Sequence, residues 1–562
     1  MKITGAQAIV ECLKEQGVTE IFGYPGGFVL PLYDALYEAR NEIHHHLTAH
    51  EQGAAHAADG YARATGKVGV AIATSGPGAT NLVTGIATAF LDSSPVVFIT
   101  GNVPLGQLGT DGFQEIDITG VTMGVTKHNY LVQSPEELPG ILREAFVVAK
   151  SGRPGPVLVD IPKDMQTEYL DYEPQTILTP SITAREEKLS DCEKCNADML
   201  NTIADLIAKA ERPLLIAGGG IIRAKGSEAL RKLARRNQIP VSSTLMGLGA
   251  FPTDDPLYLG NMGMHGTRAA NLAPARSDLI IVAAGRFSDR SIGSPSKFTQ
   301  APITVHIDID SAEFGKNYKT DYCLQGDVDS VLELLARRID ECDRSEWLAE
   351  LQSLGLLDRG DPETYSPATI IAAAQEHLGY DATIATDVGQ HQMWTAQFAQ
   401  FTRPNQLITS GGLGTMGFGL GAAIGAKIAT PERNVMLITG DGCFRMNCNE
   451  LFTARAHQVG ITVILMNNSV LGMVRQWQTL LYDHHYSATT LGSFTDFVAL
   501  AKAHGCEGFR VTDMPSLHES LEKAAKLNEE GITVVLDCCI DKDAMVTPML
   551  TPGAGIEDFL MN

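Results

Sequence analysis

An early segment of the chain returns, in altered form, near its C-terminal end. Residues 74–101 read TSGPGATNLVTGIATAFLDSSPVVFITG, and residues 409–440 read TSGGLGTMGFGLGAAIGAKIATPERNVMLITG. Both contain TSG, a glycine-rich turn, a helical run of small residues, a short loop and an apolar strand that ends in ITG. The offset between the copies is too long for a solenoid repeat. The chain is therefore expected to contain two related α/β domains, separated by an unrelated insert.

The length of 562 residues also requires more than one core. We expect an α/β protein with three doubly wound parallel-sheet domains, of which the first and third are related. The strand–glycine unit PLLIAGGGIIRA at 213–224 indicates a Rossmann-like middle domain. The expected domains are 1–165, 188–343 and 368–543. The tail 544–562 is rich in Pro and Gly and has apolar anchors, so it could be a lid or a packed strap.

Composition excludes several classes of protein. A net charge of −23 argues against nucleic-acid binding, and no apolar run is long enough to span a membrane. The N-terminal residues have neither signal-peptide nor transit-peptide layout. Ten scattered cysteines indicate reduced thiols and a cytoplasmic protein. Cys192 and Cys195 form a CxxC without a second pair nearby, which does not favour a metal site.

The stretch from Gly440 to Asn468 begins with GDG and ends with two asparagines. The apolar runs 434–439 and 461–466 predict two buried parallel strands, joined by a helix over 449–458 that Asn449 caps. Asp441 and Asn468 would then lie at carboxyl ends of strands, where open α/β sheets bind ligands. A carboxylate and an amide oxygen suit Mg²⁺ that also binds a ligand's phosphates. The alternative is two ordinary turns.

Two further motifs have both a structural and a functional interpretation. Glu51, in AHEQGAAHAADGYARATG (49–66), could cap a helix, or it could be a buried carboxylate that meets a basic nitrogen across an interface. Gly218, Gly219 and Gly220 could form a tight strand-to-helix turn, or they could let the backbone approach a diphosphate.

Many ordered motifs resemble the acetohydroxyacid synthase catalytic subunits among the thiamine-diphosphate-dependent enzymes. They cover essentially the whole chain: GYPGG (23–27), AHEQGA (49–54), TSGPGATN (74–81), DGFQE (111–115), TKHNY (126–130), SGRPGPVLVDIPKD (151–164), GMHG (263–266), GRFSDR (285–290), DVGQHQMW (387–394), TSGGLGTMGFG (409–419), the GDG…NN unit and GMVRQWQ (472–478). Ser288 departs from the commoner GRFDDR, but both arginines of that segment are present.

The resemblance implies a thiamine diphosphate site built by the first and third domains. Asp441, Asn468 and the backbone oxygen of Val470 would bind Mg²⁺. Glu51, from a neighbouring subunit, would favour the imino tautomer of the aminopyrimidine. The implied contact residues are Pro25, Glu51, Pro77, Asn81, Val388, Gly389, Gln390, His391, Gly414, Met416, Gly440, Asp441, Gly442, Asn468, Val470, Gly472 and Met473. Without the resemblance, Met416 and His391 would be ordinary core residues.

The implied reaction decarboxylates pyruvate and condenses the hydroxyethyl enamine with a second 2-oxo acid. Pyruvate as acceptor gives 2-acetolactate, and 2-oxobutyrate gives 2-aceto-2-hydroxybutyrate, both in branched-chain amino acid synthesis. Arg290 would pair with the acceptor carboxylate and Trp477 would shape the acceptor pocket, with a discrimination of ~1–3 kcal/mol. The implied catalytic residues are Glu51, Gly27, Phe113, Gln114, Lys163, Arg290, Trp477 and Met473. Trp477 alone would more often be a core aromatic.

The resemblance also implies a structural FAD in the middle domain, because net carboligation consumes no electrons. The implied residues are Arg153, Gly218, Gly219, Gly220, Thr244, Leu245, Met264, His265, Gly266, Arg286, Arg290, Asp308, Ile309, Asp327 and Val328. Two subunits would complete each active site, so a homodimer or tetramer is expected, with a separate small regulatory subunit. The alternative function is a flavin-linked pyruvate oxidase. A non-catalytic homologue would lack Glu51, Asp441 or Asn468, and all three are present.

Overall fold

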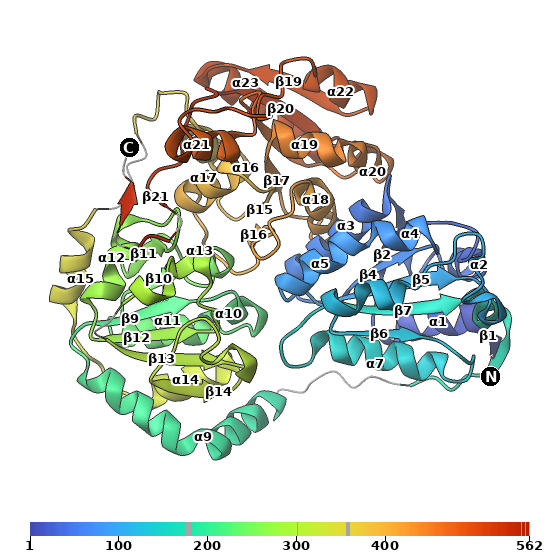
Figure 1. Ribbon diagram of the computed structural model, residues 1–562, viewed down its shortest axis with the longest axis horizontal. Helices are drawn as coiled ribbons and strands as arrows, with labels where there is room; N and C mark the ends of the chain where they lie inside the picture. Colours follow the sequence, from blue (N-terminus) through green and yellow to red (C-terminus); the bar gives the residue numbers. More distant parts are fainter. Residues whose placement is uncertain (176–182, 300–301, 356–359, 552, 557, 561–562) are drawn as a thin grey trace.

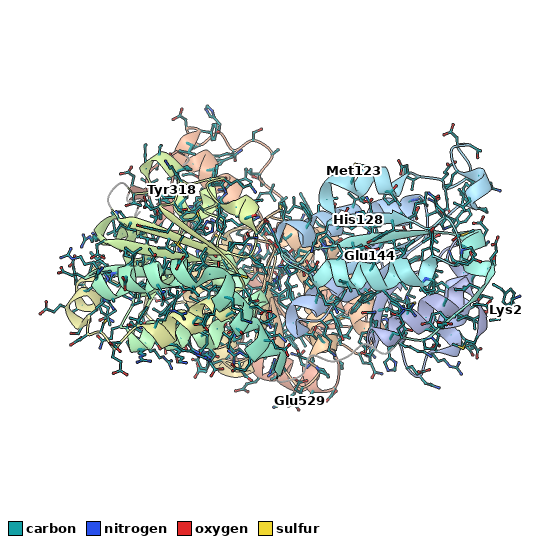
Figure 2. The ribbon with its side chains drawn as sticks, turned by 90° about the horizontal axis from the view of Figure 1, so that it is seen from below. Lys2, Met123, His128, Glu144, Tyr318 and Glu529 are labelled. Atoms are coloured by element: carbon teal, nitrogen blue, oxygen red, sulfur yellow. The ribbon has the colours of Figure 1, made fainter. Side chains whose placement is uncertain are left out.

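The computed structural model describes all residues except 176–182, 300–301, 356–359, 552, 557 and 561–562. Three parallel six-stranded sheets with flanking helices form three domains that meet around a common centre (Figure 1). The view from below shows the first and middle domains on opposite sides, with Met123, His128 and Glu144 on the first (Figure 2). The predicted fold class, three parallel α/β domains, is confirmed.

The first domain has its strands in the order β3-β2-β4-β5-β7-β6, all parallel. They are β2 (Glu20–Tyr24), β3 (His44–Leu47), β4 (Gly69–Ala73), β5 (Val96–Asn102), β6 (His128–Leu131) and β7 (Val157–Pro162). The main helices around this sheet are α1 (Gly5–Glu15), α2 (Leu30–Glu38), α3 (Glu51–Thr65), α5 (Val83–Leu91) and α7 (Leu138–Lys150). A short antiparallel pair, β1 (Lys2–Thr4) with β8 (Tyr169–Asp171), extends this unit beyond residue 165.

The third domain repeats this topology. Its order β16-β15-β17-β18-β20-β19 places the second strand outside the first, and the sixth inside the fifth, as in the first domain. The strands are β15 (Thr383–Thr386), β16 (Leu407–Ile408), β17 (Val435–Gly440), β18 (Thr462–Asn467), β19 (Glu507–Val511) and β20 (Val534–Cys539). The helices are α16 (Pro367–Leu378), α17 (Gln390–Phe398), α18 (Phe418–Ala429), α19 (Asp441–Asn447), α20 (Leu451–Ala456), α21 (Gly472–Leu481), α22 (Phe497–Ala503) and α23 (Met514–Glu529). The two copies of the sequence repeat therefore mark two domains of the same topology.

The middle domain has a different order, β11-β10-β9-β12-β13-β14. All six strands are parallel, and the order in which they are added across the sheet reverses between β9 and β12. This is the strand order of a Rossmann fold, as predicted. The strands are β9 (Pro213–Ala217), β10 (Val241–Ser243), β11 (Tyr258–Asn261), β12 (Leu279–Ala283), β13 (Ile303–Asp308) and β14 (Tyr322–Gln325). Helices α9 (Thr183–Lys209), α10 (Gly220–Arg223), α11 (Ser227–Arg236), α12 (Arg268–Arg276), α13 (Asp289–Ile292), α14 (Val328–Arg338) and α15 (Ser345–Gln352) surround it.

Helices α3 and α18 lie side by side where the first and third domains meet (Figure 1). Their small residues allow the two backbones to approach closely. A methyl group at Gly425 would lie 2.7 Å from the carbonyl carbon of Ala57, and one at Gly60 would lie 2.7 Å from Cα of Ala422. The Ala/Gly composition of both segments is therefore required by the packing between domains.

The C-terminal tail is a packed strap, which answers the question that the sequence left open. After β20 the chain passes α21 and reaches the middle domain, where β21 (Met549–Leu550) begins. Leu550 and Ile556 are buried in the hydrophobic core of that domain. The backbone N–H of Leu550 donates to the carbonyl of Met264 at 2.8 Å, and Lys297 donates to the carbonyl of Gly553 at 3.0 Å.

One predicted element was only partly right. The helix expected over 449–458 is present as α20, but Glu450 and not Asn449 precedes it, and a 3₁₀ turn at Cys448–Glu450 leads into it. The sequence did not predict α19, which begins at Asp441 directly after β17. Asp441 is compatible with the first turn of a helix, because the N-terminal dipole favours a negative charge there. None of the ten cysteines forms a disulfide. Among the described residues, no helix is long and apolar enough to cross a membrane.

Candidate cofactor-binding site

Three helices of the third domain begin at one place, at the carboxyl ends of its strands. Helices α17, α19 and α21 start at Gln390, Asp441 and Gly472. A methyl group at Gly472 would lie 2.7 Å from Nδ2 of Asn468, and one at Gly440 would lie 2.9 Å from Nδ1 of His391. Helix N-termini present free N–H groups and positive dipole ends, so this corner suits a diphosphate.

Asp441 and Asn468 end neighbouring parallel strands, as the sequence predicted. Asp441 is buried, its Oδ2 has no hydrogen-bond partner among the described residues, and burial raises the pKa of its carboxyl to about 6. The side-chain oxygen of Asn468 accepts the N–H of Val470 at 3.2 Å. A buried carboxylate oxygen without a donor is costly unless a cation or ligand meets it. The residues present therefore fit a Mg²⁺ ion.

Gln390, His391 and Met416 are the other predicted side chains at this corner. Gln390 donates to the side-chain oxygen of Gln476 at 2.9 Å and to the carbonyl of Ala544 at 2.7 Å. His391 is buried with Nε2 unpartnered among the described residues, and burial lowers its pKa to about 3, so the ring is neutral. Met416 lies beside Gly442: its Cε would be 3.8 Å from a methyl group there.

The first domain presents Glu51 at the start of α3. The cap of this helix is His50, whose side chain accepts the N–H of Gln52, so the interpretation of Glu51 as a cap was wrong. Oε2 of Glu51 accepts a hydrogen bond from Asn81 at 2.9 Å. Four other predicted residues of the first domain are exposed, and all of them lie on segments that follow strands β2, β4 and β5: Pro25, Gly27, Pro77 and Phe113. Gln114 and Lys163 are half-buried, and Lys163 lies over the ring of Phe28 at 5.8 Å.

A cavity of about 1220 Å³ lies where the three domains meet. It exceeds the size typical of sites for drug-sized ligands, so a dinucleotide-sized molecule fits. The structure brings most of the predicted flavin residues to its wall: Arg153, Gly219, Gly220, Thr244, Leu245, Met264, His265, Arg286, Arg290, Asp308, Ile309, Asp327 and Val328. Val388, Gly389, Gly414, Met473 and Trp477 line the same cavity from the third domain.

Two of the predicted flavin glycines do not line this cavity. A methyl group at Gly218 would lie 2.6 Å from Cα of Gly285, and one at Gly266 would lie 2.7 Å from the carbonyl oxygen of Asn261. Gly218 therefore serves the tight turn after β9, which was the alternative interpretation of the triple glycine. Gly219 and Gly220 follow it at the switch point between β9 and β12, where open sheets bind ligands.

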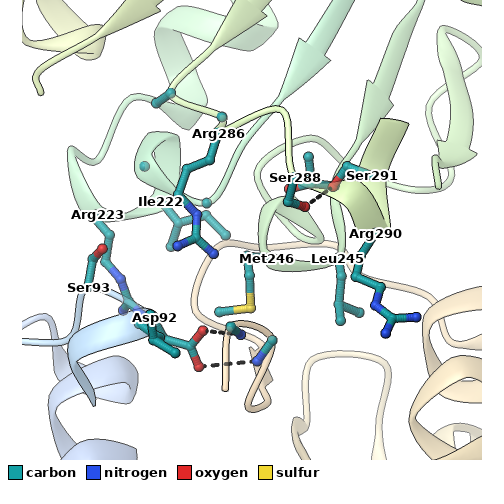
Figure 3. Close-up of a pocket in the computed structure, with 18 of the residues that line it drawn as sticks. Asp92, Ser93, Ile222, Arg223, Leu245, Met246, Arg286, Ser288, Arg290 and Ser291 are labelled. Carbon is teal, nitrogen blue, oxygen red and sulfur yellow. Dashed lines mark hydrogen bonds between the residues drawn. The ribbon is translucent and has the colours of Figure 1, made fainter. Parts of the chain in front are cut away.

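The wall between the first and middle domains carries opposite charges. Arg153 donates to Glu313 at 2.7 Å across the two domains, and Asp310 lies 3.5 Å from the same guanidinium. Burial, with the nearby carboxylates of Glu313 and Asp310, raises the pKa of Asp308 to about 6. The side chain of Arg286 points into the cavity (Figure 3), and its guanidinium makes no hydrogen bond or ion pair with any described residue.

Trp477 and Arg290 meet at the end of the cavity that α21 closes. The guanidinium of Arg290 lies 5.9 Å from the centre of a Trp477 ring, and Nη1 donates to the sulfur of Met264 at 3.0 Å. The indole N–H of Trp477 is buried without a partner among the described residues. The two residues come from different domains, so their contact is a feature that only the fold could create.

The remaining predicted site residues do not line the cavity. They are Pro25, Gly27, Glu51, Pro77, Asn81, Phe113, Gln114 and Lys163 in the first domain, and Gln390, His391, Met416, Gly440, Asp441, Gly442, Asn468, Val470 and Gly472 in the third. The first group follows strand ends of its own sheet. The second surrounds the corner where α17, α19 and α21 begin.

Several residues at the site were not predicted from the sequence. Asp92, Met246 and Arg223 line the cavity, and Gln476 holds Gln390. Asp387 accepts the N–H groups of Gly417 and Gly419 at 2.8 and 2.9 Å and so fixes the start of α18. For the charged and amide residues among them, the only local indication of a role was a polar side chain among small or apolar neighbours.

Three family models match this chain. They describe the N-terminal TPP binding domain, the central domain and the C-terminal TPP binding domain of thiamine pyrophosphate enzymes, over residues 3–121, 200–335 and 387–538. Thiamine pyrophosphate and thiamine diphosphate are the same compound. The matched ranges correspond to the three sheets described above.

Curated relatives match the chain along its whole length. An acetolactate synthase of Arthrospira platensis is 46% identical, covering 100% of this chain and 98% of that protein. The acetolactate synthase isozyme 2 large subunit of Escherichia coli K12 is 45% identical, covering 99% of each. A probable acetolactate synthase large subunit of Methanocaldococcus jannaschii is also 45% identical, covering 99% of this chain and 95% of that protein. None of these names favours the pyruvate oxidase alternative.

Proposed function

This chain belongs to the acetolactate synthase large-subunit family of thiamine pyrophosphate enzymes, and we propose that it decarboxylates pyruvate and joins the remaining two-carbon unit to a second pyruvate or to 2-oxobutyrate. The products are 2-acetolactate and 2-aceto-2-hydroxybutyrate, which places the enzyme in branched-chain amino acid synthesis. The observation that carries this proposal is the convergence of three helix N-termini on Asp441 and Asn468.

The diphosphate of thiamine binds in the corner where α17, α19 and α21 begin. The free backbone N–H groups at the starts of α17 and α21 would be available to this anion, and the helix dipoles would favour it. Asp441, Asn468 and the backbone oxygen of Val470 hold Mg²⁺ against it. The unpartnered Oδ2 of Asp441 supports this assignment, because Mg²⁺ supplies the positive charge that a buried carboxylate requires. Met416, beside Gly442, supports the body of the cofactor.

Thiamine diphosphate, when bound, supplies the electron sink for loss of CO₂ and for the new carbon–carbon bond. The protein holds a proton at the pyrimidine ring nitrogen through Glu51. Asn81 fixes Oε2 of that carboxyl at 2.9 Å, which leaves Oε1 available to the ring. Glu51 serves the third domain of a neighbouring subunit, with Gly27, Phe113, Gln114 and Lys163 at the entrance. The exposure of Gly27 and Phe113 in the single chain supports this arrangement.

Arg290 binds the carboxylate of the second 2-oxo acid, and Trp477 lies against its alkyl group. The cation–π contact between the two orients the guanidinium. FAD occupies the large cavity and acts as a structural ligand, since the overall reaction transfers no electrons. The size of the cavity, Gly219 and Gly220 at the switch point, and the unpaired Arg286 support this assignment. A separate small regulatory subunit and a cytoplasmic location complete the proposal.

The test is product formation from pyruvate by protein stripped of flavin and metal. Acetolactate that depends on thiamine diphosphate, Mg²⁺ and FAD is the expected result. Chelation of Mg²⁺ should abolish the activity, and Asp441→Ala should lose it even with excess metal. Acetate or acetyl phosphate with reduced flavin, and no acetolactate, would contradict the proposal and indicate a pyruvate oxidase.

A competition assay tests the role of Trp477. With pyruvate and 2-oxobutyrate present together, Trp477→Leu should lower the ratio of acetohydroxybutyrate to acetolactate about tenfold, because one methyl contact is worth ~1–3 kcal/mol. The KM for pyruvate should change little. Trp394→Leu is the matched control: that tryptophan is buried in the core of the third domain and should affect stability without altering the product ratio.

A further inference from the structure

Four charged side chains gather where the three domains meet. Asp59, Arg63 and Asp92 come from the first domain, and their side chains are almost fully buried. Arg63 donates to both oxygens of Asp59 at 2.7 and 2.6 Å, and to Oδ2 of Asp92 at 3.0 Å. Arg223, on α10 of the middle domain, extends toward Asp92 and Ser93 (Figure 3). Two carboxylates and two guanidinium groups thus form an electrically balanced cluster.

This cluster holds a loop of the third domain. Gly411 and Gly412 donate their backbone N–H groups to Oδ2 and Oδ1 of Asp92 at 3.2 and 2.7 Å. Arg63 donates to the carbonyl oxygen of Thr409 at 2.6 Å. Thr88, on α5, is 2.7 Å from the hydroxyl of Thr415. The first domain therefore holds residues 409–415 in position through charge-assisted hydrogen bonds, which are stronger than neutral ones.

The same loop forms part of the proposed thiamine site. Gly414 and Met416 are among the proposed contacts of thiamine diphosphate, and Met416 lies beside Gly442 at the diphosphate corner; Gly411 and Gly412 line the adjoining large cavity. The loop packs closely against the first domain: a methyl group at Gly412 would lie 2.8 Å from Cβ of Leu91 and 3.0 Å from Oδ1 of Asp92. The loop can therefore shift only if the contact with Asp92 is broken.

Arg223 differs from the other members of the cluster. Its side chain makes no hydrogen bond or ion pair with any described residue, although it lines the cavity wall. Burial lowers the pKa of its guanidinium to about 10, and the neighbouring charge of Arg63 adds to this, while Asp59 and Asp92 oppose it. Its charge balances the net negative charge that Asp59 and Asp92 leave beside Arg63.

We propose that Asp92 is a positioning residue for the thiamine site of its own chain: it fixes the 409–416 loop through Gly411 and Gly412, and Arg63 and Arg223 keep its charge balanced from two different domains. This inference rests on the proposed function. It gives the first domain two tasks. Glu51 reaches a neighbouring subunit, whereas Asp92 supports the cofactor corner of the same chain. Through Arg223 the middle domain contributes a positive charge to this cluster, without a direct bond to the loop.

The experiment uses the full chain with Asp92→Asn and, separately, Arg223→Met. Asparagine keeps the shape of Asp92 but places an NH₂ group against an N–H donor, so one of the two glycine amides loses its acceptor. Methionine keeps the apolar stem of Arg223 and removes its charge. Glu519→Gln is the matched control, because Glu519 forms an exposed ion pair with Lys523 on α23. Thermal unfolding first establishes that each variant is folded.

Two readouts are measured. The first is backbone hydrogen exchange of the peptide covering 409–416, in protein without cofactors. The second is the affinity for thiamine diphosphate at saturating Mg²⁺, by calorimetry, together with the KM for pyruvate at saturating cofactor. Asp92→Asn should speed exchange of this peptide and raise the dissociation constant about tenfold, with an unchanged KM for pyruvate. Arg223→Met should change both readouts in the same direction but less, and Glu519→Gln should change neither.

Unchanged exchange and affinity in folded Asp92→Asn would overturn the inference. Faster exchange with unchanged affinity would also overturn it, because the contact would then serve stability alone. Should Asp92→Asn fail to fold, the two readouts on Arg223→Met decide in the same way. Wild-type protein that binds no thiamine diphosphate would instead contradict the proposed function, and the exchange measurement distinguishes the two failures.

Discussion

At the scale of single residues, three buried polar atoms with no partner in the described part of the chain lie at the proposed site. Oδ2 of Asp441, Nε2 of His391 and Nε1 of Trp477 have no partner among the described residues. Native proteins leave few such atoms, and each one costs free energy. These three lie on the segments that follow β15, β17 and β18, where a ligand can supply the missing partners; other such atoms, for example those of Ser227 and Tyr130, lie away from the site.

A different buried carboxyl, Glu450, gives a prediction about pH. Its Oε2 accepts the N–H of Ala49 at 3.2 Å across the contact between the first and third domains. Burial raises its pKa from 4.5 to about 7. The folded protein therefore holds this proton more tightly than the unfolded chain. This stabilisation is present at low pH and is lost as the pH rises from about 4.5 to about 7.

Glu450→Gln mimics the protonated form at every pH. The variant should unfold at a higher temperature than wild type at pH 8, by an amount that shrinks toward pH 5, and the difference in unfolding free energy at pH 8 should be about 1–3 kcal/mol. Thermal melts at both pH values check this. The exposed Glu519→Gln serves as a control without such pH dependence. A variant less stable than wild type at pH 8 would show that the folded protein stabilises the ionised carboxylate of Glu450, so that its pKa is not raised.

At the scale of elements, α21 and the strap are joined by one amide. The side-chain oxygen of Gln476 accepts from Gln390 and from the N–H of Val546, each at 2.9 Å, and its nitrogen donates to the carbonyl of Val546 at 2.9 Å. Gln476 is buried, so no water can replace these partners. The helix that carries Trp477, the cofactor corner and the strap thus share one hydrogen-bond network.

Gln476→Leu should destabilise the strap. The substitution removes the acceptor of the Val546 N–H, the Gln476 donor to the Val546 carbonyl, and one of the two acceptors of the Gln390 amide, at a cost of about 2–4 kcal/mol. Limited proteolysis should then cleave residues 540–556 faster than in wild type, and the thermal midpoint should fall. Gln478→Leu on the same helix is the matched control, because Gln478 is only half-buried. Equal cleavage rates in the two variants would show that the strap is held by other contacts.

The elements also show what sequence can and cannot predict here. The buried strands β17 and β18 were predicted within one residue, because continuous apolar runs between polar turns leave little choice. The start of α19 was missed, because Gly-Asp-Gly is typical of a turn. Nothing local shows that a helix begins directly after the strand. The junction of Asp92 with Gly411 joins residues far apart in the chain, so no local pattern could reveal it.

At the scale of the whole molecule, the proposed site is shared between chains. Glu51 of one subunit and Asp441 of another should complete each site in a symmetric oligomer. Co-expression of Glu51→Gln chains with Asp441→Ala chains should therefore restore activity. Random pairing makes half of the dimers mixed, and each mixed dimer has one intact site of two, so about a quarter of the wild-type activity is expected.

Each variant alone should be inactive, and their mixture should lose the restored activity when the chains cannot exchange. The control is co-expression of Asp441→Ala with Asn468→Ala chains. These two residues belong to the same half of the site, so no combination of chains creates an intact one. No activity in the first mixture would indicate that each site lies within a single chain. Restored activity in the control would indicate that Asp441 and Asn468 do not belong to the same half of the site.

The strap has a consequence for the order of events during synthesis. Leu550 and Ile556 complete the hydrophobic core of the middle domain, yet the ribosome makes them only after the entire third domain. Domains usually fold in turn as they emerge. The middle domain must instead wait with part of its core uncovered, so nascent chains of this enzyme expose apolar side chains that chaperones can recognise until Leu550 and Ile556 have been made.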